Sequence, residues 1–197
     1  MGWNVVLAER LGMRVEEAVC LVGYKGDPDR RIGIVAPLTD CPSLSAGSGD
    51  GDGAVVGEVV RRIESEFGRW DEVHGVALDD PAQKVRVVAI MNAFHPEEVQ
   101  RVMEAALSKG WIDDADDGSA VLYLTGQARE FGLAAAMEKG IKVVCVGHRS
   151  AEEWGIRYLA VEVKKAFPML DVVEVYEDEE PRPPRPPKIA KTQILQL

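Results

Sequence analysis

Short apolar runs alternate with amphipathic stretches along most of the chain, and this alternation is the feature that most limits its fold. The run at residues 120–124 precedes a helical stretch at 128–139, which Gly140 closes, and a second apolar run follows at 141–146. Runs of this length fit buried strands, and the stretches between them fit helices that cover a sheet. The same pattern predicts further strands at 31–38, 73–78, 85–91 and 172–176, and further helices at 54–67, 96–109 and 150–167. We therefore expect an α/β fold, a layered sheet flanked by helices.

The second of these apolar runs ends in a glycine, and a histidine follows at once, in the sequence VVCVGHRSAEEW. His148 comes directly after Gly147, and Glu152 lies four residues further along. Strand ends are where α/β proteins display ligand-binding groups, and an imidazole with a carboxylate suits a divalent cation. The competing interpretation is an ordered surface histidine near a helix start. Ser150 and Glu153 have the spacing of a capping box, which leaves Glu152 as the candidate ligand of the two acids.

Composition excludes several classes of protein. The 197 residues are 46% hydrophobic, which is enough for one domain with a substantial core. A formal net charge of −10 argues against direct binding of nucleic acid or of an anionic membrane, since both require a positive field. Three widely spaced cysteines, Cys20, Cys41 and Cys145, form no Cys-x-x-Cys motif and are typical of a reducing compartment. Because no apolar run is long enough to span a membrane and no secretory signal is present, we expect a cytoplasmic protein, with a nuclear location as the alternative.

Several segments, in order, are similar to one protein family. They are the run from Thr125 to Ala160 (TGQAREFGLAAAMEKGIKVVCVGHRSAEEWGIRYLA), the turn and strand from Gly23 to Ala36 (GYKGDPDRRIGIVA) and the strand from Lys84 to Met91 (KVRVVAIM). Together they resemble the C-terminal half of the Ngg-interacting-factor-three family, whose members are also called GTP cyclohydrolase I type 2 homologues or dinuclear-metal-centre proteins. The resemblance implies the second half of a two-lobed α/β fold.

The resemblance also implies roles for two residues. His148 and Glu152 take the positions of ligands for divalent metal ions, whose identity stays open. Separately, Gln127 follows the carboxyl end of a predicted strand, a position that suits a second-shell role in orienting a ligand or substrate. The other half of the family fold supplies a His-His pair and an aspartate. The histidines of this chain, which also include His74 and His95, contain no adjacent pair.

Two functions from different classes remain open. In the first, the chain is a truncated or half-site form of a metal-binding protein with hydrolase-like ancestry, in which bound metals would activate a water. In the second, it is a non-catalytic protein-interaction module that binds a transcriptional adaptor. No Ser-His-Asp or Cys-His arrangement stands out, so no catalytic residue is assigned. In either case an uncovered apolar surface would favour a homo-oligomer.

The composition divides the chain into three expected segments. Residues 1–22 are expected to form a remnant N-terminal helix, at 4–11, and a linker, and residues 23–177 the α/β domain. Residues 178–197 contain PRPPRPPK and are expected to form a disordered, proline-rich basic tail. Such a tail also matches the pattern that aromatic grooves of partner proteins recognise.

Overall fold

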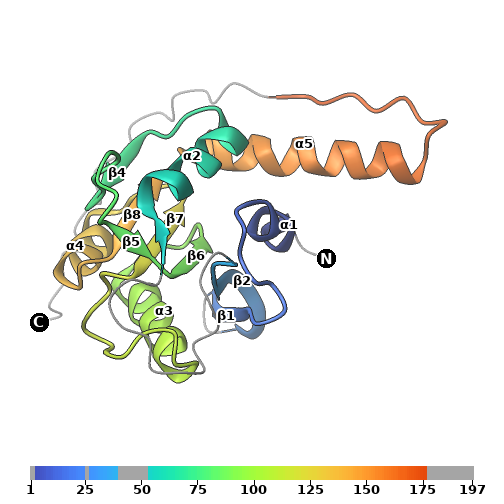
Figure 1. Ribbon diagram of the computed structural model, residues 1–197. Helices are drawn as coiled ribbons and strands as arrows, with labels where there is room; N and C mark the ends of the chain where they lie inside the picture. Colours follow the sequence, from blue (N-terminus) through green and yellow to red (C-terminus); the bar gives the residue numbers. More distant parts are fainter. Residues whose placement is uncertain (1–2, 25–26, 40–52, 177–197) are drawn as a thin grey trace, which may run out of the picture.

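A computed structural model describes residues 3–24, 27–39 and 53–176. Within these residues the chain forms a six-stranded mixed sheet and a two-stranded ribbon, with helices on both faces of the large sheet (Figure 1). The strands are β1 (Val19–Tyr24), β2 (Asp27–Pro37), β3 (Ala54–Val55), β4 (Glu72–His74), β5 (Lys84–Val85), β6 (Val87–Met91), β7 (Val121–Thr125) and β8 (Lys142–Cys145). The helices are α1 (Trp3–Arg10), α2 (Val56–Phe67), α3 (Pro96–Ser108), α4 (Glu130–Glu138) and α5 (His148–Ala166).

Three parallel strands, β6, β7 and β8, form the centre of the large sheet. The order across the sheet is β1-β2-β6-β7-β8-β4, and the outer pairs are antiparallel. Every residue of the three central strands is buried. Parallel strands covered on both faces are apolar throughout, which explains the continuous apolar runs in the sequence. Helix α3 connects β6 to β7 and helix α4 connects β7 to β8, so both connections are βαβ crossovers.

The hydrophobic core lies in two layers, one on each face of the sheet. One layer joins α1, α2 and the start of α5 to the sheet through side chains such as Leu7, Val59 and Trp154. The other layer joins α3 and α4 to the opposite face through side chains such as Val102 and Ala136. The fold is therefore a helix–sheet–helix sandwich, and the predicted α/β class with a layered, helix-flanked sheet is confirmed.

The antiparallel part of the sheet differs from the prediction. Strand β1 pairs with β2, although the sequence predicted a turn at 23–31 and no strand before it. The strand predicted at 73–78 is limited to the three residues of β4. The strand predicted at 172–176 is wrong, because these residues form no strand. A β-rich sequence becomes a strand only when a neighbouring strand pairs with it, and no described strand does so here.

The expected division into three segments stays a prediction. Helix α1 packs into the same core as the sheet, and β1 spans the position after residue 22 at which we expected the α/β domain to begin. The expected tail at 178–197 lies outside the described residues. The described structure therefore includes the expected boundary after residue 22 but not the one after residue 177.

Helix α5 has 19 residues and is the longest of the described helices. Its first turns contact the core, while its second half projects away from the rest of the molecule, and the segment that follows turns back beside it (Figure 1). Neither α5 nor any other helix in the described part of the chain is long and apolar enough to cross a membrane.

Candidate functional site

The carboxyl ends of the parallel strands meet at one edge of the sheet. Strand β6 ends at Met91, β7 at Thr125 and β8 at Cys145. The side-chain oxygen of Asn92 accepts a hydrogen bond from the backbone N–H of Gly126 at 3.1 Å, which ties the loop after β6 to the loop after β7. Open α/β sheets bind their ligands outside the carboxyl ends of the strands. This edge is therefore the candidate site.

A cavity of about 300 Å³ lies at this edge, beside helix α1. Part of its lining is apolar, including Leu7 and Leu124, and its polar groups include Asn4 and Thr125. The Asn4 amide nitrogen donates a hydrogen bond to the carbonyl of Ile32 at 3.3 Å, whereas its Oδ1 is buried with no hydrogen-bond partner among the described residues. A buried acceptor without a partner suits a donor on a small ligand or a water molecule.

Helix α5 begins at the same edge of the sheet. Its N-cap is Gly147, with a φ of 88°, and a Cβ at this position would lie 2.4 Å from Oδ2 of Asp71. Glycine is required here both by the backbone conformation and by the neighbouring carboxylate. His148 follows, and its Nε2 lies 3.1 Å from Oε1 of Glu152, with side chains 53% and 58% exposed respectively. The two side chains predicted as metal ligands therefore meet at the surface, and their role as ligands stays a prediction.

A second, open hollow of about 530 Å³ adjoins His148. Its charged lining residues are Arg69, Asp71, Arg149 and Glu153. Asp71 was not singled out in the sequence. Its backbone N–H donates a 2.8 Å hydrogen bond to the carbonyl that ends β8, and its carboxylate lies against Gly147, the residue before His148. No local motif signals this contact, since it depends on the pairing of β4 with β8.

The capping box predicted for Ser150 and Glu153 is wrong. Helix α5 starts two residues before Ser150, with Gly147 as N-cap and no side-chain capping bond. Oε1 of Glu153 instead lies 2.6 Å from Nε of Arg149, one turn earlier on the helix. The two adjacent acids still differ in their partners, because Glu152 contacts an imidazole and Glu153 a guanidinium.

The loop after β7 is held by hydrogen bonds from its backbone N–H groups to side-chain acceptors. The backbone N–H of Gln127 donates to Oγ1 of Thr125 at 3.3 Å, and the exposed Gln127 side chain keeps its suggested orienting role as a prediction. The sulfur of Cys145 accepts a hydrogen bond from the N–H of Ala128 at 3.3 Å. Burial raises the pKa of the Cys145 thiol, which disfavours the nucleophilic thiolate. This cysteine is therefore a structural residue of the site.

The other two histidines lie in other elements. His74 belongs to β4 and its Nε2 lies 3.0 Å from a carboxylate oxygen of Glu72. His95 is the residue before α3 and makes no side-chain capping bond. Across residues 3–24, 27–39 and 53–176, no three His, Cys, Asp or Glu side chains gather closely enough to hold a metal ion. The described part of the candidate site thus offers two donors, His148 and Glu152.

The fold and this edge define the class: an α/β domain with a polar site at the carboxyl ends of its parallel strands. Residues 1–183 match the family model described as Duf34/NIF3 (NGG1p interacting factor 3), and the chain belongs to this family. The resemblance read from the sequence is thereby confirmed.

Individual relatives are distant and longer. The "GTP cyclohydrolase 1 type 2 homolog" of Pseudomonas aeruginosa is 26% identical over 167 residues, which cover 85% of this chain and 52% of that protein. The structure of reduced HcgD from Methanocaldococcus jannaschii is similar with a TM-score of 0.50 and 18% identity, over 82% of this chain and 50% of that one, which shows a shared fold. The protein TTHA1606 from Thermus thermophilus has a TM-score of 0.44 and 21% identity, over 88% of this chain and 54% of that one. The chain thus spans about half the length of these relatives.

Proposed function

We propose that this chain is a metal-binding member of the Duf34/NIF3 family in which His148 and Glu152 form one side of a divalent-metal site. The observation that carries the proposal is the 3.1 Å approach of the imidazole Nε2 to the carboxylate Oε1 at the carboxyl edge of the sheet. An imidazole nitrogen and a carboxylate oxygen that converge on one point are donor types that Zn²⁺ and similar ions bind.

Some neighbours of the His148–Glu152 pair favour the binding of a cation there, and others oppose it. More than half of each side chain is exposed, so an ion can reach both donors without a change in the core. The positive end of the α5 dipole lies at His148 and opposes a cation, as does the guanidinium of Arg149. The carboxylate of Asp71, which lies against the N-cap glycine, offsets part of this positive charge. The balance favours modest affinity.

Two donors do not complete a coordination shell. Catalytic zinc sites use three protein ligands and a water, and structural sites use four protein ligands. The described residues therefore fit one side of a metal site, and the remaining donors would come from water or from another molecule. We expect weak, substoichiometric binding by this chain alone.

A bound divalent ion would lower the pKa of a coordinated water. If the loaded protein is catalytic, we propose a metal-dependent hydrolase, the class suggested by the name of the Pseudomonas aeruginosa relative. For this function we also propose a cytoplasmic location, because the cysteine pattern is typical of a reducing compartment.

The test is a titration of chelator-treated protein with Zn²⁺ and Mn²⁺ by calorimetry, together with emission spectrometry of the metal bound per chain. We expect His148→Ala and Glu152→Gln each to weaken binding by about tenfold or more, since a direct ligand matters at least as much as the groups that orient it. Glu153→Gln is the matched control, one residue further along the same helix, and should leave binding unchanged. Unchanged affinity in His148→Ala would overturn the assignment, and two tightly held ions per chain would overturn the half-site.

A non-catalytic interaction module is the second candidate. The absence of a third donor beside His148 and Glu152 in the described part of the chain favours it. In that function the two side chains form an ordinary surface pair, which contributes little to stability. A chain that takes up no metal in the same titration would favour the module over the metal-binding protein.

A further inference from the structure

Most of the side chains that line the cavity of about 300 Å³ beside helix α1 are apolar. Helices α1, α2 and α5 contribute Leu7, Phe67 and Ala151 to its walls, and strands β6 and β7 contribute Ile90 and Leu124. Leu7, Ile90 and Leu124 belong to the core cluster on this face of the sheet and are no more than 5% exposed. Apolar cavities hold water poorly and bind small apolar molecules. The cavity is therefore a candidate site for the apolar part of a ligand.

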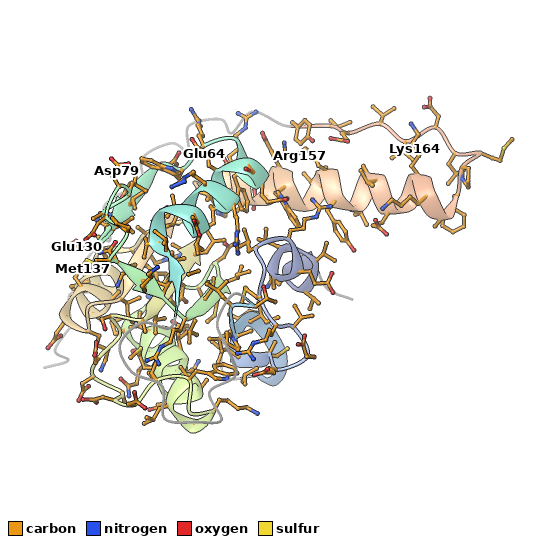
Figure 2. All side chains as sticks on the ribbon, in the orientation of Figure 1. Glu64, Asp79, Glu130, Met137, Arg157 and Lys164 are labelled. Carbon is orange, nitrogen blue, oxygen red and sulfur yellow. The ribbon has the colours of Figure 1, made fainter. Side chains whose placement is uncertain are left out.

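No charged side chain lines this cavity in the described part of the chain. Its polar side chains belong to Asn4, Asn92 and Thr125, which are all uncharged. On α2 and α5, which both contribute to the walls, the charged side chains of Glu64 and Arg157 are exposed on the outer surface (Figure 2). An ion that entered the cavity would lose its hydration without meeting an opposite charge, which is costly. The cavity is therefore suited to an uncharged ligand.

The side chain of Asn92 supplies a hydrogen-bond donor whose orientation is fixed. Its Oδ1 accepts the 3.1 Å hydrogen bond from the N–H of Gly126, and only the oxygen of the amide can accept such a bond. The other amide atom, Nδ2, makes no hydrogen bond with any described residue. Asn92 is exposed at the cavity, so a ligand can reach this donor. A fixed N–H group of this kind suits a carbonyl oxygen on the ligand.

Close contacts hold both asparagine side chains of the cavity in place. A Cβ at position 126 would lie 2.9 Å from Oδ1 of Asn92 and 3.0 Å from the Cβ of Ala151. Glycine therefore allows the loops after β6 and β7 to meet the start of α5 with no side chain between them. The Asn4 amide donates to the carbonyl of Ile32 at 3.3 Å and so ties α1 to β2. A ligand would meet a preformed site, which reduces the entropy lost on binding.

We propose that this cavity binds a small, uncharged carbonyl compound. The apolar part of the ligand fills the space between α1 and the sheet, and its carbonyl oxygen accepts a hydrogen bond from Nδ2 of Asn92. At about 30 Å³ for each water-sized group, a cavity of about 300 Å³ holds a molecule of about ten non-hydrogen atoms. Ketones, esters, amides and lactams of this size fit the description. Because Ala151 forms part of the wall, the bound molecule would lie beside the first turn of α5. The proposal concerns binding alone and does not depend on the metal site.

Three small molecules test the chemistry of the cavity. Acetophenone has an apolar ring and a carbonyl, benzoate has nearly the same shape but carries a negative charge, and toluene keeps the ring without the carbonyl. Each is titrated into isotope-labelled protein in the presence of a chelator, and the backbone amide signals of Gly126 and Ala151 report binding by nuclear magnetic resonance. We expect acetophenone to bind with a Kd on the order of 1 mM, within the limits for so small a ligand. Benzoate should bind at least about tenfold more weakly, because its charge finds no partner in the cavity.

Two substitutions separate the hydrogen bond from the apolar contacts. Asn92→Asp keeps an oxygen that accepts the N–H of Gly126, but it replaces the amide donor with a second carboxylate oxygen. It should weaken acetophenone binding by about tenfold or more and leave toluene binding within about twofold of the parent. Ile32→Trp, at a partly buried position in the lining, should fill the cavity and abolish the binding of both molecules. Gln100→Glu is the matched control, because it makes the same change from amide to carboxylate on α3, outside the cavity, and should leave all affinities unchanged.

Several results would overturn the proposal. Circular dichroism first establishes that each variant is folded, and Asn92→Asp decides the outcome if Ile32→Trp does not fold. An acetophenone affinity that Asn92→Asp leaves unchanged would exclude the proposed hydrogen bond. Benzoate binding as tight as that of acetophenone, signal changes confined to residues outside the cavity, or no change at millimolar acetophenone would each exclude the site. Because every titration contains a chelator, a chain that binds acetophenone but takes up no metal would leave this proposal intact and overturn the metal site alone.

Discussion

Replacement of Trp154 by alanine tests whether the base of helix α5 is held as the structure shows. The indole is 3% exposed and belongs to the core cluster on the α1/α2 face of the sheet. Its ring lies 6.2 Å from that of Phe67 and is stacked against Tyr158. Truncation of a buried aromatic side chain to alanine costs about 3–5 kcal/mol, and we expect a loss in this range. This is a large share of the roughly 5–15 kcal/mol by which a domain is stable.

Phenylalanine at the same position separates packing from hydrogen bonding. Trp154→Phe keeps most of the apolar contacts but removes the N–H that donates to Glu66 at 3.0 Å. The Glu66 carboxylate keeps its ion pair with Arg10, also at 3.0 Å, so it is not left without a partner. We therefore expect Trp154→Phe to cost about 1.5–3 kcal/mol, the usual range for a hydrogen bond to a charged group, which is less than the loss in Trp154→Ala.

Urea unfolding followed by far-ultraviolet circular dichroism is the suitable assay, because fluorescence itself changes when a tryptophan is removed. In thermal melts of the same variant, followed by the same signal, we expect the melting temperature to fall by about 10 °C for a chain of this length. Phe131→Ala, at an exposed position, should change stability by no more than about 0.5 kcal/mol. A Trp154→Ala loss below about 1 kcal/mol, or equal losses in both Trp154 variants, would refute the packing described for this helix.

Three further changes test other parts of the structure. Gly132→Ala should lower stability by about 1–3 kcal/mol, because its Cβ would lie 2.4 Å from a backbone oxygen in the loop before α3; a stabilised variant in thermal melts would contradict this packing. Tyr123→Phe should cost about 1–3 kcal/mol in urea unfolding, since the half-buried Ala93 carbonyl would lose the hydroxyl that donates to it at 2.7 Å; a neutral result would contradict a stabilising role for this hydrogen bond. Hydrogen bonds from Ser119 lower the pKa of Asp117, so its contribution to stability is present above the ordinary carboxyl pKa and is lost as the pH falls through its lower folded pKa. Asp117→Asn should therefore lose less stability between pH 6 and 2 than the parent, and equal losses would exclude this contribution.

The parallel half of the fold could be predicted because its information is local. Each central strand is a short apolar run, and each crossover helix repeats its apolar residues at helical spacing. Pro96 begins α3 as predicted. Strand β1 also contains a short apolar run, at residues 18–22, which the prediction overlooked; as an edge strand it is held by its pairing with β2 alone. The segment at 172–176 shows the converse, since strand-like sequence without a neighbour stays unpaired.

The candidate site divides in the same way. The contact between His148 and Glu152 follows from helical spacing, and the sequence is sufficient to predict it. The contacts of Asn92 with Gly126, and of Asp71 with the N-cap of α5, join segments that only the sheet brings together. The false capping box has a different origin. Helix α5 begins directly after Gly147, which has a φ of 88° and no side-chain capping bond, so Ser150 lies inside the first turn and cannot be the N-cap.

Helix α5 carries the candidate metal site in its first turn and a half, where His148 and Glu152 lie. Trp154 follows two residues after Glu152 and holds this part of the helix in the core, so the pair is fixed relative to the sheet. Metal binding and stability are therefore separable by mutation. Glu152→Gln, at a side chain that is 58% exposed, should weaken metal binding and change the free energy of unfolding by no more than about 0.5 kcal/mol. A larger loss of stability in this variant would mean that the pair contributes to folding, which an exposed pair of this kind does not.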